Sequence, residues 1–163
     1  MGQPGQMVPP AGEPAGDSSL VFRAGPLLCA LHLDEVIETM RPLATHPLAG
    51  TPTFVTGICI MRGIPTLVID VARLLGGAEA EVSRFVAVRT ERGPVAFATG
   101  DIHGVRSVRT GTAGRHEALL GDAPARLIAA VGTIDAVPVL LLQSMRLVPD
   151  EVWAAAAALA VPA

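Results

Sequence analysis

Short apolar runs, separated by glycines, prolines and charged residues, characterise the chain from about residue 20 to residue 148. Most of these runs have the length of a β-strand and are too short for an ordinary amphipathic helix. They predict strands over 20–22, 27–33, 84–89, 95–98, 127–134 and 137–142, with a weaker strand over 102–108. Many short strands with helices of two turns or fewer between them are typical of a β-barrel or β-sandwich. The pattern therefore predicts a mainly β fold.

The most informative stretch runs from residue 54 to residue 75. It predicts a strand that ends at Gly57, a second strand, a turn at Arg62-Gly63 and a third strand. Asp70 is placed to cap a short helix over 71–75, which the two glycines at 76 and 77 end. Arg62 is the charged residue of this otherwise apolar hairpin. It either tethers a buried carboxylate or contacts a partner.

The remaining segments divide the chain into three parts. Residues 1–17 are rich in glycine and proline, and we expect them to be disordered. Residues 18–148 form the folded domain, within which 34–40 is ambiguous between a helical turn and a strand. Proline and glycine make 41–53 a loop, and 110–125 is a polar connection. A C-terminal helix and tail occupy 149–163. We expect this helix to pack on the barrel, and the alternative is a helix that binds a partner.

An internal repeat relates two segments of the chain. Residues 64–75 and 137–148 both contain a proline, a buried strand, a polar capping residue, an arginine and two apolar residues. The offset is constant at 73 residues: the prolines Pro65 and Pro138 differ by 138 − 65 = 73, and the arginines Arg73 and Arg146 differ by 146 − 73 = 73. The repeat predicts two similar subdomains packed together. The same offset makes Asp135 the counterpart of Arg62 in the repeat. Since the second hairpin has an aspartate at this position, the hairpin does not need an arginine for its own geometry.

Composition restricts the possible functions. The 163 residues are 50% hydrophobic and 17% charged, with a net charge of −3, which argues against a nucleic-acid-binding protein. Cys29 and Cys59 lie in apolar runs and are expected to be buried thiols in a reducing compartment. The N-terminus does not have a signal-peptide pattern, and no apolar run reaches the roughly 18 residues of a membrane span. We therefore expect a soluble, cytoplasmic protein without direct membrane insertion.

Candidate catalytic motifs are weak. Asp101 and His103, in Gly-Asp-Ile-His-Gly after a strand, resemble the first metal-binding motif of metallophosphoesterases, but the motif's usual downstream partners are absent from the sequence. The alternative is a solvated turn. The sequence also has no Gly-x-Ser-x-Gly elbow and no phosphate-binding loop of the Gly-x-x-x-x-Gly-Lys type. We expect no enzyme activity, no cofactor and no metal.

A charge pair is the remaining candidate site. Glu38 and Arg62 are expected on neighbouring strands, where a carboxylate and a guanidinium can pair through two hydrogen bonds. Such a pair would fix the floor of a groove between two barrels. The alternative is an ordinary salt bridge at the rim, worth about 0–1 kcal/mol.

These residues resemble the CheW-like family, the adaptor domain of bacterial chemosensory arrays. The likeness covers about residues 18–148 and is most specific from 20 to 75. The matching segments are Leu-Val-Phe at 20–22, Val-Ile-Glu at 36–38, Phe-Val-x-Gly at 54–57, Ile-Met-Arg-Gly at 60–63 and Ile-Asp-Val at 69–71.

The resemblance implies a fold and a function. The fold is two intertwined five-stranded SH3-like barrels, with short helices and a C-terminal helix. The function is a scaffold without catalysis that couples the cytoplasmic tips of chemoreceptors to the regulatory domain of a CheA-type histidine kinase, and other CheW-like proteins are further candidate partners. The receptor-binding groove would involve Val36, Glu38, Gly57, Arg62 and Gly63.

The chain also departs from the family pattern. Ile60 stands where the family usually has asparagine, Leu67 where it has proline, and Gln143 where an aspartate or asparagine is common. The second half has lost further markers around 99–102. Two hypotheses therefore stand beside the coupling adaptor. One is an array spacer that binds receptor or other CheW-like domains but not the kinase, and the other is the metal-dependent phosphoesterase.

Overall fold

The computed structural model describes residues 18–110, 128–143, 148 and 150–154, and predictions for the rest of the chain lie outside this part. The fold is mainly β, as predicted. Its elements are β1 (Ser18–Ala24), β2 (Leu27–His32), the 3₁₀ helix η1 (Leu33–Glu35), β3 (Val36–Met40), β4 (Thr45–His46), β5 (Val55–Met61), β6 (Ile64–Asp70), α1 (Val71–Leu74), β7 (Arg84–Thr90), β8 (Gly93–Thr99), β9 (Ile102–Ser107), β10 (Arg109–Thr110), β11 (Ile128–Ile134) and β12 (Val137–Leu142).

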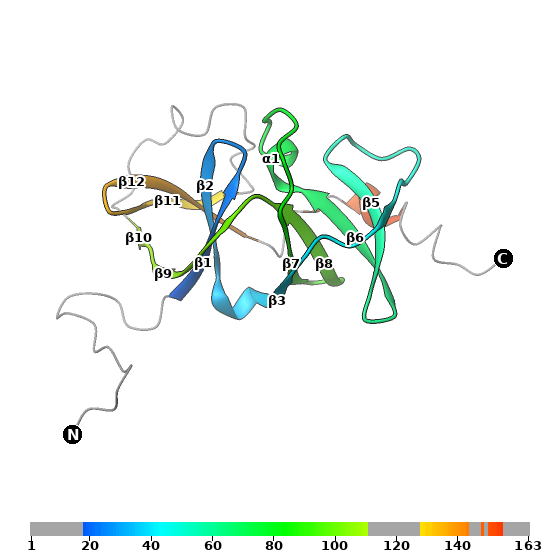
Figure 1. Ribbon diagram of the computed structural model, residues 1–163, viewed down its shortest axis with the longest axis horizontal. Coiled ribbons are helices and arrows are strands. Elements are labelled where there is room, and N and C mark those ends of the chain that lie inside the picture. Colours follow the sequence, from blue (N-terminus) through cyan, green and yellow to red (C-terminus); the bar gives the residue numbers. More distant parts are fainter. Residues whose placement is uncertain (1–17, 111–127, 144–147, 149, 155–163) are drawn as a thin grey trace, which may run out of the picture.

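The strands form two six-stranded sheets that exchange hairpins. Sheet A has the order β10-β11-β12-β2-β1-β9, and sheet B has the order β4-β5-β6-β8-β7-β3. Each strand of sheet A therefore corresponds to the strand of sheet B whose number differs by six. In sheet A the parallel pair β12–β2 joins the exchanged hairpin to the other strands, and in sheet B the parallel pair β6–β8 does so. Figure 1 shows the two sheets side by side along the longest axis of the molecule.

This correspondence extends the repeat found in the sequence. The β5–β6 turn begins at residue 62 and the β11–β12 turn at residue 135, which gives the predicted offset of 135 − 62 = 73. The β1–β2 and β7–β8 hairpins are also equivalent, at a different offset. Their turns begin at Gly25 and Glu91, and 91 − 25 = 66. The predicted pair of intertwined subdomains is confirmed. Each sheet has six strands where five were expected, because a two-residue strand, β4 or β10, pairs at one edge.

Three apolar clusters explain why so many strands are continuously hydrophobic. The largest cluster lies between the sheets and includes Phe22 of sheet A and Phe97 of sheet B, both fully buried. A second cluster around Val68 lies on the other face of sheet B, and a third around Val21 lies on the other face of sheet A. Strands whose two faces are both covered show apolar runs instead of alternation.

The structure corrects several predicted boundaries. The strand at Gly57 does not end there, because β5 runs through it with a register irregularity between Val55 and Gly57. The loop predicted over 41–53 contains β4, which pairs with β5. The ambiguous segment 34–40 divides into η1 and β3. Leu33, predicted to end the second strand, starts η1 and is 41% exposed.

Both predicted helices that the structure describes pack as expected. The Asp70 carboxylate accepts a hydrogen bond from the backbone N–H of Arg73 at 3.3 Å and caps α1. The described part of the C-terminal helix, 150–154, buries Val152 completely against the large cluster. Arg92 in the β7–β8 turn pairs with Asp150 at 2.9 Å. The helix is therefore docked on the barrels by apolar contact and by charge.

The tips of the two equivalent hairpins share an unusual backbone conformation. The turn residues have positive φ in both hairpins: 52° at Arg62, 79° at Gly63, 49° at Asp135 and 64° at Ala136. A two-residue turn with two left-handed residues matches the twist of the flanking strands, and glycine or asparagine usually supplies it. Arginine at 62 and alanine at 136 are therefore placed against their conformational preference.

We expect Ala136→Gly to raise the free energy of unfolding by about 0.5–1 kcal/mol, because it relieves a left-handed alanine. The equivalent turn offers the reverse substitution, Gly63→Ala, where a Cβ would meet no atom within 4 Å. It should lower the free energy of unfolding by a similar amount. Urea unfolding of both variants measures the effects. Equal signs for the two changes would contradict the equivalence of the turns.

Candidate functional site

The predicted charge pair is present. The Arg62 guanidinium donates from Nε to Glu38 Oε2 at 2.6 Å and from Nη2 to Oε1 at 2.7 Å. Two parallel hydrogen bonds fix the plane of the guanidinium as well as its position. The Arg62 side chain is 75% exposed and that of Glu38 is 27% exposed. The carboxylate is therefore a support, and the arginine is the group presented to solvent.

The curvature of sheet B brings the two residues together. Glu38 lies on the edge strand β3, opposite Ala87 of β7. Arg62 lies at the tip of the β5–β6 hairpin, and β7 and β8 separate β3 from that hairpin in the sheet. The prediction that the two residues lie on neighbouring strands is therefore wrong. The pair thus joins one edge of the sheet to the hairpin tip. Two residues 24 positions apart in the sequence become hydrogen-bonded because the sheet curls.

The pair shifts both ionisation equilibria toward the charged forms. Hydrogen bonds from Arg62 hold the pKa of the Glu38 carboxyl below its usual value. The same bonds raise the pKa of Arg62. Since the folded pKa of Glu38 lies below the unfolded one, the pair stabilises the fold fully above the unfolded pKa, and this contribution disappears as pH falls through the folded pKa.

We expect the coupling between Glu38 and Arg62 to depend on pH in that direction. A double-mutant cycle with Glu38→Gln and Arg62→Ala should give a favourable coupling energy at pH 7. The coupling should start to decline as pH drops below about 4.3, the unfolded pKa of glutamate. Urea unfolding at several pH values measures it. A coupling energy that stays constant into strong acid would contradict the assignment.

The other predicted groove residues occupy different environments. Gly63 follows Arg62 in the exposed turn. Val36 begins β3, two residues before Glu38, and packs against the large apolar cluster. Gly57 lies five residues before Arg62 on β5, which is about 16 Å along a strand. A Cβ on Gly57 would lie 2.0 Å from the His46 carbonyl oxygen, so this glycine allows the close approach of β4.

Exposed apolar side chains surround the pair in the sequence. Ile60 and Ile64 flank Arg62 on the hairpin and are each 55% exposed. Ile37 precedes Glu38 on β3 and is 43% exposed. Large exposed apolar side chains around an oriented charge are typical of a protein-docking surface, where apolar contact supplies affinity and the charge supplies orientation. The surface therefore suits a protein partner.

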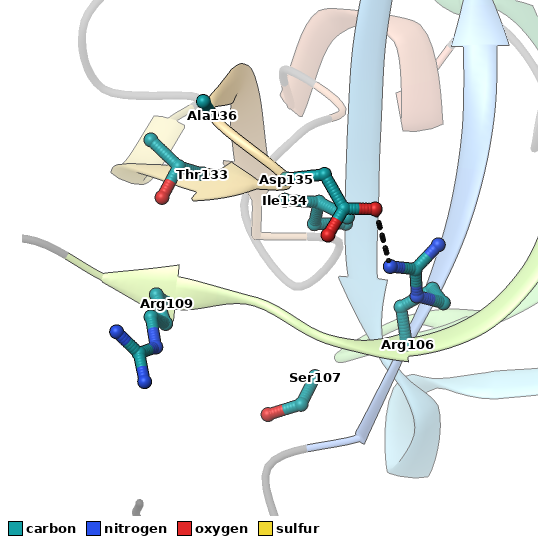
Figure 2. Close-up of a pocket in the computed structure, with 7 residues that line it drawn as sticks. All are labelled: Arg106, Ser107, Arg109, Thr133, Ile134, Asp135 and Ala136. Carbon is teal, nitrogen blue, oxygen red and sulfur yellow. Dashed lines mark hydrogen bonds and ion pairs between the residues drawn. The ribbon is translucent and has the colours of Figure 1, made fainter.

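A second charge pair occupies the equivalent place on sheet A. Arg106 of β9 donates from Nη2 to Asp135 Oδ2 at 2.9 Å, and Asp135 is the first residue of the β11–β12 turn. The pair lies beside a cavity of about 520 Å³ that Ser107, Arg109 and Thr133 also line. Figure 2 shows these side chains around the pair. The sequence repeat placed Asp135 opposite Arg62, but it gave no sign of Arg106. Arg106 lies two residues beyond Gly104, which the 66-residue offset makes the counterpart of Glu38.

The two thiols and the residues of the candidate metal motif occupy other positions than the paired residues. Cys29 and Cys59 are buried free thiols, and burial raises the pKa of Cys29 to about 12 and raises that of Cys59. Asp101 is exposed and accepts a hydrogen bond from the Ser83 hydroxyl at 3.0 Å. His103 is exposed on β9. Within the described residues, no three or more histidine, cysteine or acidic side chains form a group able to hold a metal.

Across 18–110 and the shorter described ranges that follow, no helix combines the length and the apolar character needed to cross a bilayer.

The fold and the site define a protein of two interlocked β-barrels with an exposed, oriented charge pair. A family model described as CheW-like domain matches residues 18–152. The chain therefore belongs to the CheW-like domain family, and the predicted resemblance is confirmed.

Solved structures agree with this fold. One is titled as the crystal structure of the scaffolding protein TtCheW from Thermoanaerobacter tengcongensis. The match has a TM-score of 0.69 and 17% sequence identity, and it covers 81% of this chain and 92% of that one. A search of curated proteins gave no match.

Proposed function

We propose that this chain is a non-enzymatic adaptor that couples the cytoplasmic tip of a chemoreceptor to the regulatory domain of a CheA-type histidine kinase. Membership of the CheW-like family supports a scaffold role. The observation that carries the proposal is Arg62, held by two hydrogen bonds to Glu38 and still 75% exposed. These are the two residues that the family resemblance assigns to receptor binding.

The backbone supports a functional reason for this arginine. Arg62 has φ of 52°, a conformation that asparagine or glycine adopts more readily. The equivalent turn has aspartate at this position and forms the same turn without an arginine. Residues held against their conformational preference cluster at functional sites. The arginine is therefore retained for a contact, in our proposal with an acidic or carbonyl group of the receptor hairpin.

The adaptor acts by presenting one surface to the receptor and another to the kinase at the same time. The receptor tip would lie across Arg62 and Gly63, with Glu38 fixing the guanidinium and Val36 anchoring β3 to the core. Gly57 would act indirectly, by holding β4 against β5. The proposal places this protein at chemosensory arrays in the cytoplasm and requires no cofactor.

A spacer role is the second candidate. It is favoured by the second half of the chain, where family markers are lost and where the sheet-A charge pair has the opposite polarity to Glu38 and Arg62. A spacer would bind receptor or other CheW-like domains without engaging the kinase.

Binding to two purified partners separates these functions. A receptor cytoplasmic hairpin and the kinase regulatory domain, both from the same genome, are titrated separately against the full chain by calorimetry. Binding to both supports the coupling adaptor, and binding to the receptor hairpin alone supports the spacer. Binding to neither would show that the family membership describes only the fold.

A further inference from the structure

A polar cavity lies on sheet A where β9 gives way to β10, beside the β11–β12 turn. Its volume of about 520 Å³ is within the range of sites that hold small molecules. Two arginines, a serine and a threonine supply hydrogen-bond donors to its lining: Arg106, Arg109, Ser107 and Thr133. Figure 2 shows the guanidinium groups of Arg106 and Arg109 on opposite sides of the view. The lining therefore suits a ligand that is rich in acceptor oxygens.

A buried valine fixes how two of these donors point. Val108 lies between β9 and β10, is only 9% exposed and belongs to the apolar cluster around Val21. Side chains alternate between the two sides of an extended chain, so Ser107 and Arg109 point away from that cluster. Both are exposed. The packing of one apolar side chain thus directs a hydroxyl and a guanidinium to the same side.

The backbone places a second hydroxyl next to Arg109. Thr133 and Arg109 are register partners in the antiparallel β10–β11 pair, where the Cβ atoms of partners lie about 4.5–5.5 Å apart on one face. Gly132 admits β10 at this position, because a Cβ on it would lie 2.5 Å from the Arg109 carbonyl oxygen. The threonine and the arginine are therefore held together by strand pairing.

The cavity is electropositive although the chain is acidic. The whole chain has a net charge of −3, whereas two arginines and one aspartate leave a net charge of +1 on the described lining. A second cavity, of about 320 Å³, gives the contrast, since Arg23, Glu81 and Asp101 leave its lining with a net charge of −1. The positive charge is thus a local property of the sheet-A cavity.

Asp135 supplies the anion that Arg106 binds in this structure. One hydrogen bond of 2.9 Å joins Arg106 Nη2 to Asp135 Oδ2. The aspartate side chain is 81% exposed, and such surface pairs are weak. A phosphate group can accept two parallel hydrogen bonds from a guanidinium. The aspartate is therefore a weak internal competitor for any phosphate that enters the cavity.

We propose that this cavity binds a diphosphate group, either free or as part of a small molecule. Arg106 and Arg109 lie about 10 Å apart along an extended chain, so a ligand with charged oxygens at both ends reaches both guanidiniums better than a single phosphate does. Ser107 and Thr133 donate from their hydroxyls. The ligand takes the place of the Asp135 carboxylate at Arg106.

Two features define what the site recognises. The described lining residues include no aromatic side chain on which a base or other ring would stack, so recognition falls on the anionic group. None of these residues belongs to the proposed receptor groove. The inference therefore goes beyond the proposed function and does not rest on it.

Calorimetric titration of the full chain with inorganic pyrophosphate tests the proposal. The buffer contains no other phosphate, no sulfate and no divalent cation, and sodium chloride keeps the ionic strength constant. The wild type should bind one equivalent with a Kd below about 1 mM, and orthophosphate should bind about 10-fold more weakly. Arg106→Gln and Arg109→Gln should each weaken pyrophosphate binding at least about 10-fold.

Asp135→Asn should have the opposite effect and tighten pyrophosphate binding about 5-fold, because it removes the competing carboxylate. Asparagine is compatible with the turn, where φ is 49°. The ion pair of Arg92 and Asp150 is a close match for that of Arg106 and Asp135: both are 2.9 Å long, with exposures of 53% and 85% against 48% and 81%. Arg92→Gln and Asp150→Asn should therefore leave the affinity unchanged.

The outcomes separate a built site from general attraction and from misfolding. No saturable binding by the wild type would overturn the proposal, and so would equal effects of the matched substitutions in the two ion pairs. Equal affinity for orthophosphate would overturn the assignment to a diphosphate. If Arg109→Gln loses its native circular dichroism, Arg109→Lys replaces it and should still weaken binding, since an ammonium does not reproduce the fork of donors. The gain in affinity expected for Asp135→Asn is a result that misfolding does not produce.

Discussion

Replacing Gly57 with alanine is expected to lower the free energy of unfolding by about 3 kcal/mol. A Cβ at this position would lie 2.0 Å from the His46 carbonyl oxygen and 2.7 Å from its carbonyl carbon. Both atoms belong to backbone, so no side-chain rotation relieves the clash. The φ of 149° adds strain for any residue other than glycine. The strand β4 must therefore separate from β5, which opens one edge of sheet B.

Gly63→Ala is the matched control for this change. It also places alanine at a positive φ, of 79°, but its Cβ would meet no atom within 4 Å. Its cost is the backbone strain alone, about 1 kcal/mol. Thermal and urea unfolding of both variants isolates the steric cost as the difference. A Gly57→Ala protein as stable as Gly63→Ala would show that β4 does not approach β5 as closely as described.

Arg62→Ala is expected to weaken binding of the receptor hairpin about 10- to 100-fold, because it removes the oriented cation from the proposed docking surface. The melting temperature should change by only a few degrees, since the side chain is 75% exposed and its salt bridge is at the surface. Kinase-domain binding should be unchanged. Arg62→Lys should recover only part of the receptor affinity, because an ammonium cannot reproduce the planar, doubly bonded guanidinium.

Arg92→Ala controls for the loss of any surface arginine. Arg92 also lies in a hairpin turn associated with sheet B, is 53% exposed and pairs with a carboxylate, Asp150. It should leave receptor affinity unchanged. Equal losses from both substitutions would indicate a general charge effect. A large loss of stability in Arg62→Ala with normal receptor affinity would make Arg62 a structural residue.

The hydrophobic pattern predicted most of the fold because strand formation here is a local property. The runs around Phe22 and Phe97 are buried on both faces, and the sequence shows this as apolar continuity. The register irregularity at Gly57 was not predictable in the same way. A glycine in a strand reads as a boundary, whereas here it admits the backbone of another strand from a distant segment. The strand β4 was missed because two residues give no periodicity.

The candidate site was predicted unevenly for a similar reason. Glu38 and Arg62 were paired because both were expected on neighbouring strands, and their contact is confirmed although β7 and β8 separate the strands that carry them. Asp135 was found through the repeat. Arg106 was not, because Gly104 is the residue equivalent to Glu38, and the ion pair forms one pleat further along β9. Curvature of the sheet decides which residues meet, and sequence spacing does not record it.

Formation of a ternary complex tests the central claim most directly. The receptor hairpin is immobilised, and the kinase regulatory domain is passed over it with and without the full chain. The proposed adaptor predicts that the kinase domain is retained only when the chain is present, and that Arg62→Ala abolishes this retention while Arg92→Ala does not. Retention of the chain on the receptor hairpin without the kinase domain, at saturating concentrations of both, would contradict coupling.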